Sequence, residues 1–351
     1  MQLNGDNMRH PFLLISVLTI GIASSTSLNA QQAVDQVPVH LPAGHDASEP
    51  SGLVLLIHGY TSTGPDTENW YRFKDLATSR GYIYAYPTAP TDLFGNTYWN
   101  ATNACCSFGG SPNSPDHVGY FEDLIAYIDT QYNVDFNKIH LIGHSNGGFM
   151  CYRIACDRAD LIASIVPGSG ATWDDPAQCD PSQPVSVLHT HGTADDTVSY
   201  NGGTFGWNDY PGAPGSTAQW AAFNGCTSGP VEMGPAFDSN GQVNRVVFEG
   251  CPDNGDVELW RYENVDHWPN YNNAAKNLIF DFFDSHPKQP ESEDNCEADI
   301  DQSGVVNITD FSLLLVNYGA AGVNVADINN DLIVNIDDFT ILLEQWGPCA
   351  P

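Results

Sequence analysis

Basic side chains are scarce in this chain of 351 residues, where 11 Lys and Arg stand against 43 Asp and Glu and the formal net charge is -32. So acidic a protein repels nucleic acids and anionic membrane surfaces, which excludes both as partners and disfavours a polyanionic substrate. No Lys or Arg follows Lys288, although aspartates recur throughout that last segment. This asymmetry indicates bound cations near the C-terminal end.

The sequence also lacks an apolar run long enough to span a bilayer, which takes about 20 residues. An apolar run at residues 12–23 follows Arg9 and His10 and precedes small and polar residues up to Ala30. This order is typical of a secretory signal peptide at residues 1–30. We therefore expect an exported protein, secreted or associated with the cell surface, with no membrane span.

No two of the nine cysteines form a C-x-x-C pair, which argues against a thiolate metal site. In an exported chain cysteines are expected to form disulfides, and the odd number leaves at least one of them unpaired. Two bridges are preferred because of the segments they bracket, Cys226–Cys251 and Cys296–Cys349. The pairing of five others stays open: Cys105, Cys106, Cys151, Cys156 and Cys179.

Short apolar runs alternate with segments of helical periodicity along the first 280 residues. The runs are residues 53–57, 83–86, 139–142, 185–188 and 257–262, and residues 118–128 have helical spacing. Continuous apolar runs are typical of parallel strands buried on both faces. The alternation predicts an α/β fold with a mostly parallel sheet and helices on both of its faces. Ligands of such sheets bind beyond the carboxyl ends of the strands.

A Gly-His-Ser-Asn-Gly motif at residues 143–147 follows one of these runs and precedes a segment compatible with a helix. This is the context of a nucleophile elbow, which presents a serine on a tight turn between strand and helix. A serine hydroxyl is a weak nucleophile, so it needs a base and backbone N–H groups that meet the developing oxyanion. We predict Ser145 as the nucleophile and the amides of Asn146 and Tyr60 as the oxyanion hole. The alternative is an ordinary glycine-rich loop.

The base and the acid of a catalytic triad are expected at later strand ends. His267 follows the run 257–262 and has the chain order expected of the base, after the serine and the acid. Four other histidines at strand ends are explained more simply as partners of backbone groups: His58, His144, His189 and His191. The acid is expected in the loop after residues 185–188, where Asp195 and Asp196 are neighbours and position alone leaves both open.

Two segments read as irregular. Residues 201–215 are rich in Gly, Pro, Asn and aromatics, which predicts a long surface loop. Its Trp207 and Tyr210, together with Trp268, are candidate substrate contacts, because aromatic rings stack on aromatic acyl groups and sugars; packing against the body is the alternative.

Residues 285–295 carry prolines and charges with almost nothing apolar, which predicts a linker. The linker separates a catalytic domain at residues 31–284 from a small domain at residues 296–351.

Several motifs, in one order, resemble a known group of hydrolases. They are Tyr98-Trp99-Asn100, Ala104-Cys105-Cys106, residues 116–121, GHSNGG at 143–148, HGTADDTV at 191–198 and HWP at 267–269. Over residues 39–283 the chain resembles the polyhydroxybutyrate depolymerase and feruloyl esterase group of secreted α/β hydrolases. The resemblance implies an α/β-hydrolase fold, Ser145, Asp195 and His267 as the triad, and hydrolysis of carboxylic esters carried by polymers. The chain departs from the usual pattern at Asp266 and Trp268, which flank His267 directly and bear on the shape of the acyl pocket.

The C-terminal segment contains two copies of a calcium loop like that of an EF-hand. The expected ligands are Asp299, Asp301, Ser303 and Asp310 in the first copy and Asp327, Asn329, Asp331 and Asp338 in the second. A hard cation takes oxygen ligands from alternate positions of a tight loop and a carboxylate at its end. Each loop precedes an apolar segment, residues 311–318 and 339–346, and the pair resembles a type I dockerin. That resemblance implies a small all-α domain with structural Ca²⁺ at both loops and a cohesin-like protein partner.

The leading hypothesis is a secreted serine esterase that acts on feruloyl or acetyl esters of plant polysaccharide and needs no cofactor for catalysis. Within the same chemistry, the alternative is a poly-3-hydroxybutyrate depolymerase. From another class, the alternative is a non-catalytic adhesion or scaffold component that works through its dockerin-like domain.

Overall fold

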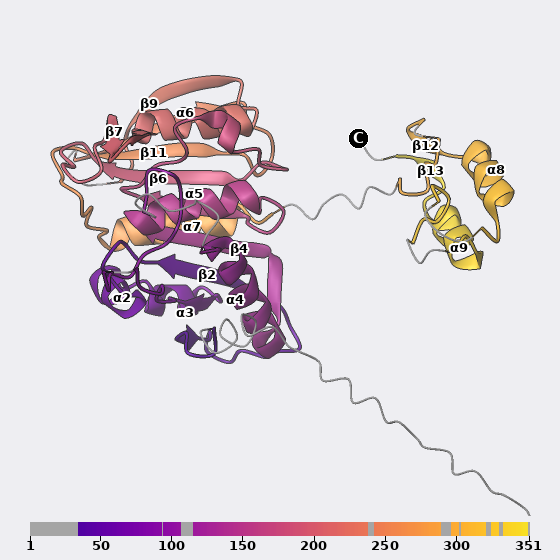
Figure 1. Cartoon of the computed structure of the whole chain (residues 1–351), viewed down its shortest axis with the longest axis horizontal. Helices are drawn as coiled ribbons and strands as arrows, with labels where there is room; N and C mark the ends of the chain where they lie inside the picture. Colours follow the sequence, from indigo (N-terminus) through magenta and orange to yellow (C-terminus); the bar gives the residue numbers. More distant parts are fainter. Residues whose placement is uncertain are drawn as a thin grey trace, which may run out of the picture.

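The computed structural model describes residues 34–92, 94–106, 115–237, 242–288, 296–301, 303–320, 324–329 and 333–349. Residues up to 288 form a body built on one large sheet, and the segments from residue 296 form a small domain with its own core (Figure 1). The expected signal peptide at residues 1–30 lies outside the described residues, as does most of the expected linker.

The large sheet has nine strands in the order β1-β3-β2-β4-β5-β6-β11-β10-β9. The six strands from β3 to β11 in this order are parallel, and antiparallel strands lie at both edges. The bounds in sheet order are β1 Val39–His40, β3 Ile83–Ala85, β2 Ser51–Ile57, β4 Val134–His144, β5 Ser164–Gly168, β6 Ser186–Gly192, β11 Val257–Tyr262, β10 Val243–Glu249 and β9 Ser228–Pro235. The prediction of a mostly parallel sheet is confirmed.

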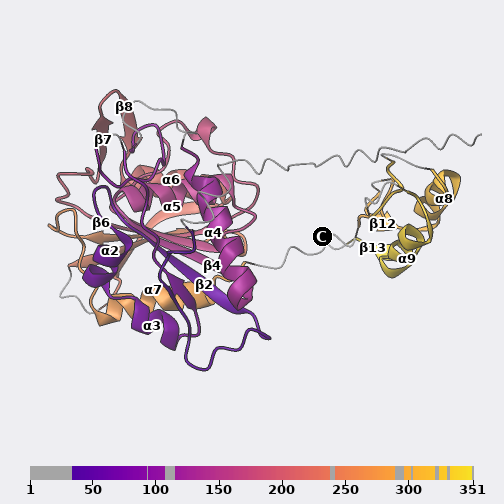
Figure 2. The same cartoon turned by 60° about the horizontal axis from the view of Figure 1, so that its bottom comes forward.

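Strand β2 illustrates why its sequence is apolar without alternation. Leu53, Leu55 and Ile57 pack into the core on one face of the sheet, and Val54 and Leu56 pack into the core on the other. Helices supply both cores (Figure 2). On the first face they are α4 (His117–Tyr132), α5 (Asn146–Asp157) and α6 (Ala213–Phe223), and on the second α2 (Gly64–Tyr71), α3 (Lys74–Ser79) and α7 (Asn273–Ser285).

The expectation of an irregular loop at residues 201–215 is wrong in part. A hairpin of β7 (Gly202–Phe205) and β8 (Asn208–Pro211) occupies most of the segment, and α6 begins at Ala213. Most side chains of the hairpin are exposed or only partly buried. Without a buried face, the sequence carries no alternation of apolar and polar residues that would mark the strands.

Four disulfides join Cys105 to Cys106, Cys156 to Cys179, Cys226 to Cys251 and Cys296 to Cys349. Both bridges preferred from the sequence are thereby confirmed. The unpaired cysteine is Cys151, buried in α5, where it serves as a small apolar side chain.

The first residues of the expected linker belong to the body. Ser285 is the last residue of α7, and Lys288 is only 6% exposed. The ammonium group of Lys288 donates to the carbonyl oxygens of Ala159 and Asp160, and its backbone N–H donates to Asn137. These carbonyl groups hold the chain against the body beyond residue 284, where the sequence indicated only a polar, proline-containing segment.

The small domain contains α8 (Ile308–Asn317), α9 (Ile336–Glu344) and a pair of short antiparallel strands, β12 (Val305–Val306) and β13 (Gly347–Pro348). The strands show that the domain is not all-α as expected. Each helix begins with a capping box, built on Asn307 and Asp310 in α8 and on Asn335 and Asp338 in α9. The caps start both helices three residues earlier than the apolar segments suggested.

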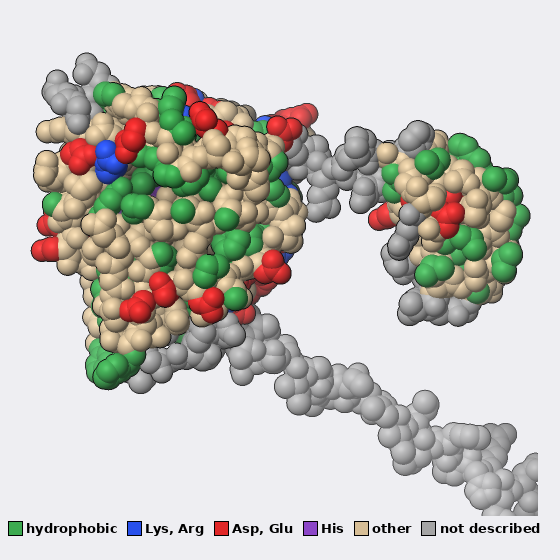
Figure 3. Space-filling view, turned by 90° about the horizontal axis from the view of Figure 1, so that it is seen from above, with side chains coloured by type: hydrophobic (Ala, Val, Ile, Leu, Met, Phe, Trp, Pro, Cys, Tyr) green, Lys and Arg blue, Asp and Glu red, His purple; other side chains and the backbone are tan. Residues whose placement is uncertain are grey.

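Most of the scarce basic side chains that the structure describes lie beside acidic ones. Arg80 contacts Asp281 and Asp284 at 2.8 and 2.7 Å, and Arg261 contacts Glu232 at 2.7 Å. On the face seen in Figure 3, acidic side chains are spread widely and the few basic ones lie close to them. These basic groups are thus largely neutralised by their neighbours. Among the described residues, no helix has the length and apolar character needed to cross a membrane.

A buried histidine on β4 makes stability depend on pH. His140 is fully buried between Phe283, which stacks on it at 4.8 Å, and Tyr82, which meets it edge-on at 5.6 Å. Its Nδ1 bonds to the hydroxyl of Ser164, while its Nε2 is buried with no partner among the described residues. Burial lowers the pKa of His140 to about 3.

We predict that His140→Phe makes the free energy of unfolding depend less on pH in the acid range. Below a pH of about 6.5 the unfolded chain gains a proton at His140 that the folded chain does not bind. The free energy of unfolding therefore decreases as the pH is lowered, by about 1.4 kcal/mol per pH unit. Phenylalanine fits between the two aromatic rings and removes this uptake. Urea unfolding between about pH 5.5 and about pH 4 should show the slope of the free energy of unfolding reduced by that amount.

Ser164→Ala is the matched control. It removes the hydroxyl partner but keeps the buried imidazole, so it should lower stability without changing the slope. A His140→Phe variant with the wild-type slope would contradict the assignment of His140 as a buried neutral ring.

Candidate active site

The predicted catalytic residues all follow strands of the parallel part of the sheet. Ser145 follows β4, Asp195 follows β6 and His267 lies beyond the end of β11. These strands lie close together in the order β4-β5-β6-β11, and their parallel direction brings the three segments to one edge (Figure 1). That edge is where ligands of such sheets bind.

The turn at Ser145 has the geometry of a nucleophile elbow. Ser145 has φ 55° and ψ -120°, a strained conformation for a residue with a side chain. Its N–H donates to the carbonyl of Gly168 at 2.8 Å, and its own carbonyl accepts from Phe149 at 3.0 Å. These bonds to β5 and α5 hold the strained residue in place between strand and helix.

Close backbone contact explains the glycine at 147. A Cβ added there would lie 2.0 Å from the carbonyl oxygen of Ile57, at the end of β2. A Cβ at Gly143 would lie 2.3 Å from the carbonyl oxygen of Gly147. Glycine is therefore required so that α5 can approach β2 and β4 closely enough to form the turn.

Asp195 and His267 form a hydrogen-bonded pair. His267 Nδ1 donates to Asp195 Oδ2 at 2.8 Å, and both residues are buried. Asp195 Oδ1 accepts from the N–H groups of Thr197 at 2.9 Å and Val198 at 2.8 Å. Burial alone would raise the pKa of Asp195, but hydrogen bonds from His191 and His267 outweigh it and hold that pKa well below its usual value.

Of the two aspartates left open by position, Asp195 is the one that contacts His267. Asp196 is exposed, and its backbone N–H donates to Asp266 at 3.3 Å. The carboxylate of Asp266 also accepts from the N–H of His267 at 2.7 Å. Asp266 therefore fixes the backbone of the histidine, and Asp195 fixes its ring.

His144 brings His267 beside the elbow. His144 Nε2 donates to the carbonyl oxygen of His267 at 2.8 Å, and the two ring centroids are 4.8 Å apart. Burial lowers the pKa of His144 to about 3, so its ring is neutral and can serve as this donor. Among the described residues no hydrogen bond joins the Ser145 hydroxyl to His267. Catalytic hydrogen bonds of this kind are often long until substrate binds.

Both predicted oxyanion donors lie on segments that adjoin Ser145. Asn146 opens α5, where backbone N–H groups have no partner within the helix and the helix dipole favours negative charge. Its side chain is bonded to the backbone of Trp99, accepting from the N–H at 2.7 Å and donating to the carbonyl at 2.8 Å. On the other side, a Cβ added to Gly59 would lie 3.3 Å from Ser145 Cβ, which places the segment of Tyr60 next to the nucleophile.

Exposed tryptophans lie near the proposed base. Trp268 stacks on His144 with ring centroids 3.9 Å apart and meets Trp70 edge-on at 5.5 Å. Both indoles are largely exposed, as is Trp207 between β7 and β8. Sequence reasoning missed Trp70, because nothing in the helix that carries it marks one residue as adjacent to a distant loop.

Tyr210 does not fit its expected role as a substrate contact. Only 5% of it is exposed, its hydroxyl accepts from the N–H of Ser199 at 3.0 Å, and its ring stacks on Phe205 at 4.8 Å. Tyr210 thus anchors the hairpin to the body, which is the packing alternative for an aromatic residue in this segment.

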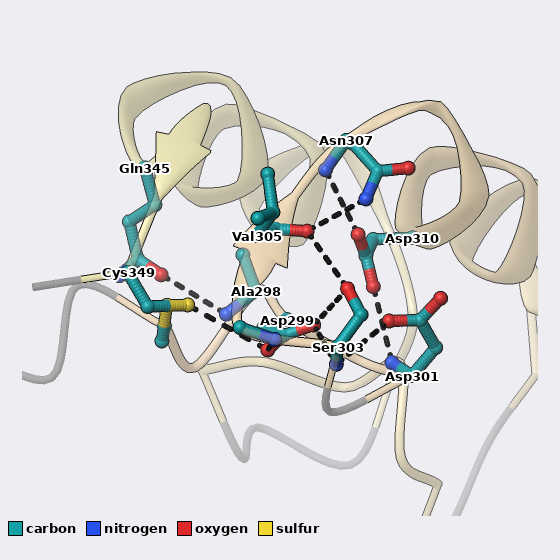
Figure 4. Close-up of a disulfide and its surroundings, with 11 residues drawn as sticks. Ala298, Asp299, Asp301, Ser303, Val305, Asn307, Asp310, Gln345 and Cys349 are labelled. Atoms are coloured by element: carbon teal, nitrogen blue, oxygen red, sulfur yellow. Dashed lines mark hydrogen bonds between the residues drawn. A yellow bond between two sulfur atoms is a disulfide. The ribbon is translucent and has the colours of Figure 1, made fainter. Parts of the chain in front are cut away.

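In the small domain, the carboxylates of the first loop converge. Ligand atoms of Asp299, Asp301 and Asp310 lie within 4.8 Å of one another. Ser303 joins them through its hydroxyl, which donates to Asp299 at 3.3 Å (Figure 4). Asp310 is fully buried and accepts from the N–H groups of Asp301 and Asn307.

The second loop has a buried carboxylate at the position equivalent to Asp310, 28 residues later. Asp338 is fully buried and accepts from the N–H groups of Asn329 at 3.2 Å and Asn335 at 2.7 Å, and Asp327 is 5% exposed. Asp331, the remaining expected ligand, lies outside the described residues.

No protein-family model matches the chain. Feruloyl esterase B from Piromyces equi is 28% identical over 224 residues, which cover 62% of this chain and 39% of that protein. Feruloyl esterase D from Neurospora crassa is 24% identical over 271 residues, which cover 74% of this chain and 82% of that protein. Poly(3-hydroxybutyrate) depolymerase from Ralstonia pickettii is 30% identical over 126 residues, 34% of this chain and 25% of that protein. The chain thus spans well under half the length of two of these relatives.

Among solved structures, an acetyl xylan esterase from Aspergillus awamori is similar with a TM-score of 0.51 at 17% sequence identity. The match covers 70% of this chain and 93% of that one. At this identity the similarity shows the fold alone, an α/β-hydrolase-like arrangement of sheet and helices. The relatives described above are named as feruloyl esterases and a depolymerase.

We predict that Gly147→Ala disrupts the elbow far more than a glycine substitution without close contacts. Its Cβ would overlap the backbone of Ile57, so the strand or the helix must move, and we expect a loss of at least about 3 kcal/mol in the free energy of unfolding. Gly44→Ala is the control, because Gly44 has φ +75° but nothing within 4 Å, and should cost only about 1 kcal/mol. Equal losses in chemical denaturation would show that close approach is not the reason for Gly147.

Proposed function

We propose that the protein is a serine carboxylic-ester hydrolase that acts on polymer-linked esters through an acyl-enzyme. The observation that carries the proposal is the 2.8 Å bond between the buried carboxylate of Asp195 and Nδ1 of His267, on loops next to the strained elbow of Ser145. A base held by an acid and set beside an activated serine is the arrangement of serine hydrolases.

In the mechanism, Ser145 attacks the ester carbonyl while Nε2 of His267 takes its proton. Asp195 keeps the proton on Nδ1, so that Nε2 is free to act as the base, and stabilises the imidazolium that forms. The N–H groups of Asn146 and Tyr60 receive the oxyanion. His267 then returns the proton to the leaving alcohol, and water activated by the same ring releases the acid from Ser145.

For the substrate we favour feruloyl or acetyl esters of plant polysaccharide. The names of the relatives support this choice, and so do the exposed rings of Trp268, Trp70 and Trp207, which offer apolar faces to an aromatic acyl group or a sugar. A poly-3-hydroxybutyrate depolymerase is the second candidate, favoured by the relative of that name. Secretion is supported by the signal-like segment at residues 1–30 and by the four disulfides.

Hydrolysis of methyl ferulate, acetylated xylan and short hydroxybutyrate oligomers tests the proposal, and we expect the first two to react fastest. Asp195→Asn should lower kcat by about 10⁴, because the amide no longer holds the tautomer of His267 in which Nε2 accepts a proton. Asp196→Asn is the matched control and should keep kcat within about twofold, since that side chain is exposed and does not contact His267.

The outcomes separate the hypotheses. Fastest turnover of the hydroxybutyrate oligomers would favour the depolymerase. No turnover, together with no labelling of Ser145 by a fluorophosphonate, would favour the non-catalytic scaffold.

For the small domain we propose structural Ca²⁺ at both loops. In the first loop the residues fit the ion, because the carboxylate oxygens of Asp299, Asp301 and Asp310 lie within 4.8 Å of one another and can all lie about 2.4 Å from one cation. The proposal for the second loop rests on its repeated sequence and on its buried Asp338. The ligands would be Asp299, Asp301, Ser303 and Asp310 in the first loop and Asp327, Asn329, Asp331 and Asp338 in the second. Bound calcium would supply positive charge to a segment that has no Lys or Arg.

A cohesin-like protein is the proposed partner of this domain. Large apolar side chains are exposed at equivalent positions of the two repeats: Ile308 and Ile336, Leu315 and Leu343, and Tyr318 and Trp346. Exposed apolar surface of this extent in a small domain is typical of a docking surface. Docking would hold the enzyme near its polymeric substrate.

Calcium binding is tested on the full chain by titration calorimetry and thermal unfolding. Chelation should lower the melting temperature of the small domain, because an ion bound only by the folded state stabilises it. Asp301→Ala should weaken one site at least about tenfold by removing a charged ligand. Glu297→Gln removes an exposed carboxylate outside the predicted ligand set and should change neither result. Unfolding that is indifferent to chelation would contradict the proposal.

A further inference from the structure

Behind Asp195 a row of buried side chains leads away from the proposed active site. His191 Nε2 lies 3.2 Å from Asp195 Oδ2, and His191 Nδ1 lies 3.0 Å from His189 Nε2. His189 Nδ1 in turn lies 2.7 Å from the hydroxyl of Tyr152 in α5. All three side chains of this row, His191, His189 and Tyr152, are fully buried.

The acceptors at the end of the row determine where every proton lies. His191 Nε2 faces Asp195 Oδ2 and, at 2.8 Å, the carbonyl oxygen of Val198. Both oxygens only accept, so Nε2 carries a proton, and in the neutral form of the ring Nδ1 is an acceptor. His189 must then donate from Nε2 and accept at Nδ1, where Tyr152 donates its hydroxyl proton. Each bond of the row therefore points toward the carboxylate.

His191 also holds the turn that carries Asp195. The N–H of Val198 donates to Asp195 Oδ1 at 2.8 Å, while the carbonyl of the same residue accepts from His191. His191 thus acts on one carboxylate oxygen directly and on the other through the backbone of Val198. The rings of His189 and His191 lie nearly parallel, with an interplanar angle of 4°, which leaves little freedom to reorient.

We propose that His191, with His189 and Tyr152 behind it, is a positioning residue of the proposed esterase, which orients Asp195 and disperses its charge so that His267 works as the base at lower pH. The inference rests on the proposed function. It assigns a role to two histidines that the sequence suggested only as partners of backbone groups, and to a tyrosine that the sequence did not single out.

The other groups that face Asp195 and His267 are the same in every variant considered below. His144 faces His267 with a neutral ring, and Asp266 accepts from the backbone of His267. Tyr210 lies near Asp195 and its hydroxyl already accepts from Ser199. Burial lowers the pKa of His189 well below its usual range, so this ring adds no charge beside the pair.

Loss of the His191 N–H should shift the pH profile in one definite direction. Without the His191 N–H, which lies 3.2 Å from Oδ2, the negative charge of Asp195 is less dispersed and favours the imidazolium form of His267 more strongly. The acid limb of the profile of kcat/KM against pH reports the protonation of the free base, so the limb moves to higher pH. A less well oriented carboxylate also lowers kcat, whereas KM, which depends on substrate contacts elsewhere, stays unchanged.

Nitrogen NMR of the full chain labelled with ¹⁵N-histidine tests the proton positions without requiring any activity. His189 and His191 should each carry a proton on Nε2 and none on Nδ1 near neutral pH, and His267 should carry its proton on Nδ1. Single histidine variants assign the signals. A proton on Nδ1 of His191, or on both nitrogens of either ring, would overturn the proposal even if the esterase is active.

Kinetics test the consequence. His191→Leu should lower kcat by roughly 10- to 100-fold, the range for loss of a hydrogen bond to a charged group, and shift the acid limb upward with KM unchanged. His191→Gln, which keeps an N–H near the same position, should restore part of kcat and return the limb toward the wild-type pH. A loss of kcat with an unmoved limb, or no rescue by glutamine, would mean a merely structural role and overturn the proposal.

Tyr152→Phe keeps the test decisive if His191→Leu does not fold. It removes one hydroxyl at the far end of the row, so both histidines can exchange tautomers. We expect kcat to fall by about threefold to tenfold and the acid limb of the pH profile to move to higher pH, as in His191→Leu. Tyr271→Phe is the matched control, because its buried hydroxyl bonds to Thr190 outside the row and its loss should leave the limb in place. Equal profiles for the two variants would overturn the proposal. Absence of wild-type turnover and of Ser145 labelling would instead overturn the proposed function, and the NMR result would stand by itself.

Discussion

A charged carboxylate buried beneath the carboxyl edge of the sheet is the constraint on which the rest of the proposed site depends. Asp195 is 6% exposed and its pKa lies well below the usual value, so it is ionised where water is scarce. An uncompensated charge in such a place would be strongly destabilising, and hydrogen-bond donors must surround it. The turn after β6 provides two backbone N–H groups, and two imidazoles provide the rest. The fold around this group is therefore arranged to keep one negative charge in one position.

The same constraint explains why the strands carry so many histidines at their ends. An imidazole can donate from one nitrogen and accept at the other while it stays neutral, which suits a buried position between a backbone carbonyl and another polar group. His58 donates from Nδ1 to Gly59 and accepts at Nε2 from Ala89, and His144 holds the carbonyl of His267. Neutral rings of this kind fix loops without adding charge near Asp195. The ring that contacts the carboxylate through Nδ1 and retains a nitrogen for chemistry is that of His267.

Much of the body could be predicted because its strands are buried on both faces. Runs such as β2 and β11 are apolar for a physical reason, and the residues after them are polar because parallel strands gather their ends at a binding edge. The choice between Asp195 and Asp196 could not be made from position, since it depends on which side chain turns inward beneath His267. The edge strand β9 was missed because its side chains are mostly exposed, and Trp70 because its neighbour Trp268 is distant in sequence.

Asp195 and the aspartates of the small domain show how neighbouring side chains decide what a carboxylate can do. Both oxygens of Asp195 lie against N–H groups of the protein, and His267 is among these donors. Asp310 is buried and capped by backbone N–H groups in a similar way, yet it lies beside Asp299 and Asp301, whose carboxylates are more accessible and converge on it. Like charges gathered this closely repel one another unless a cation lies between them. The same side chain would thus support a hydrogen-bonded base in one domain and an ion in the other, because Asp195 lies beside imidazoles and Asp310 beside two further carboxylates.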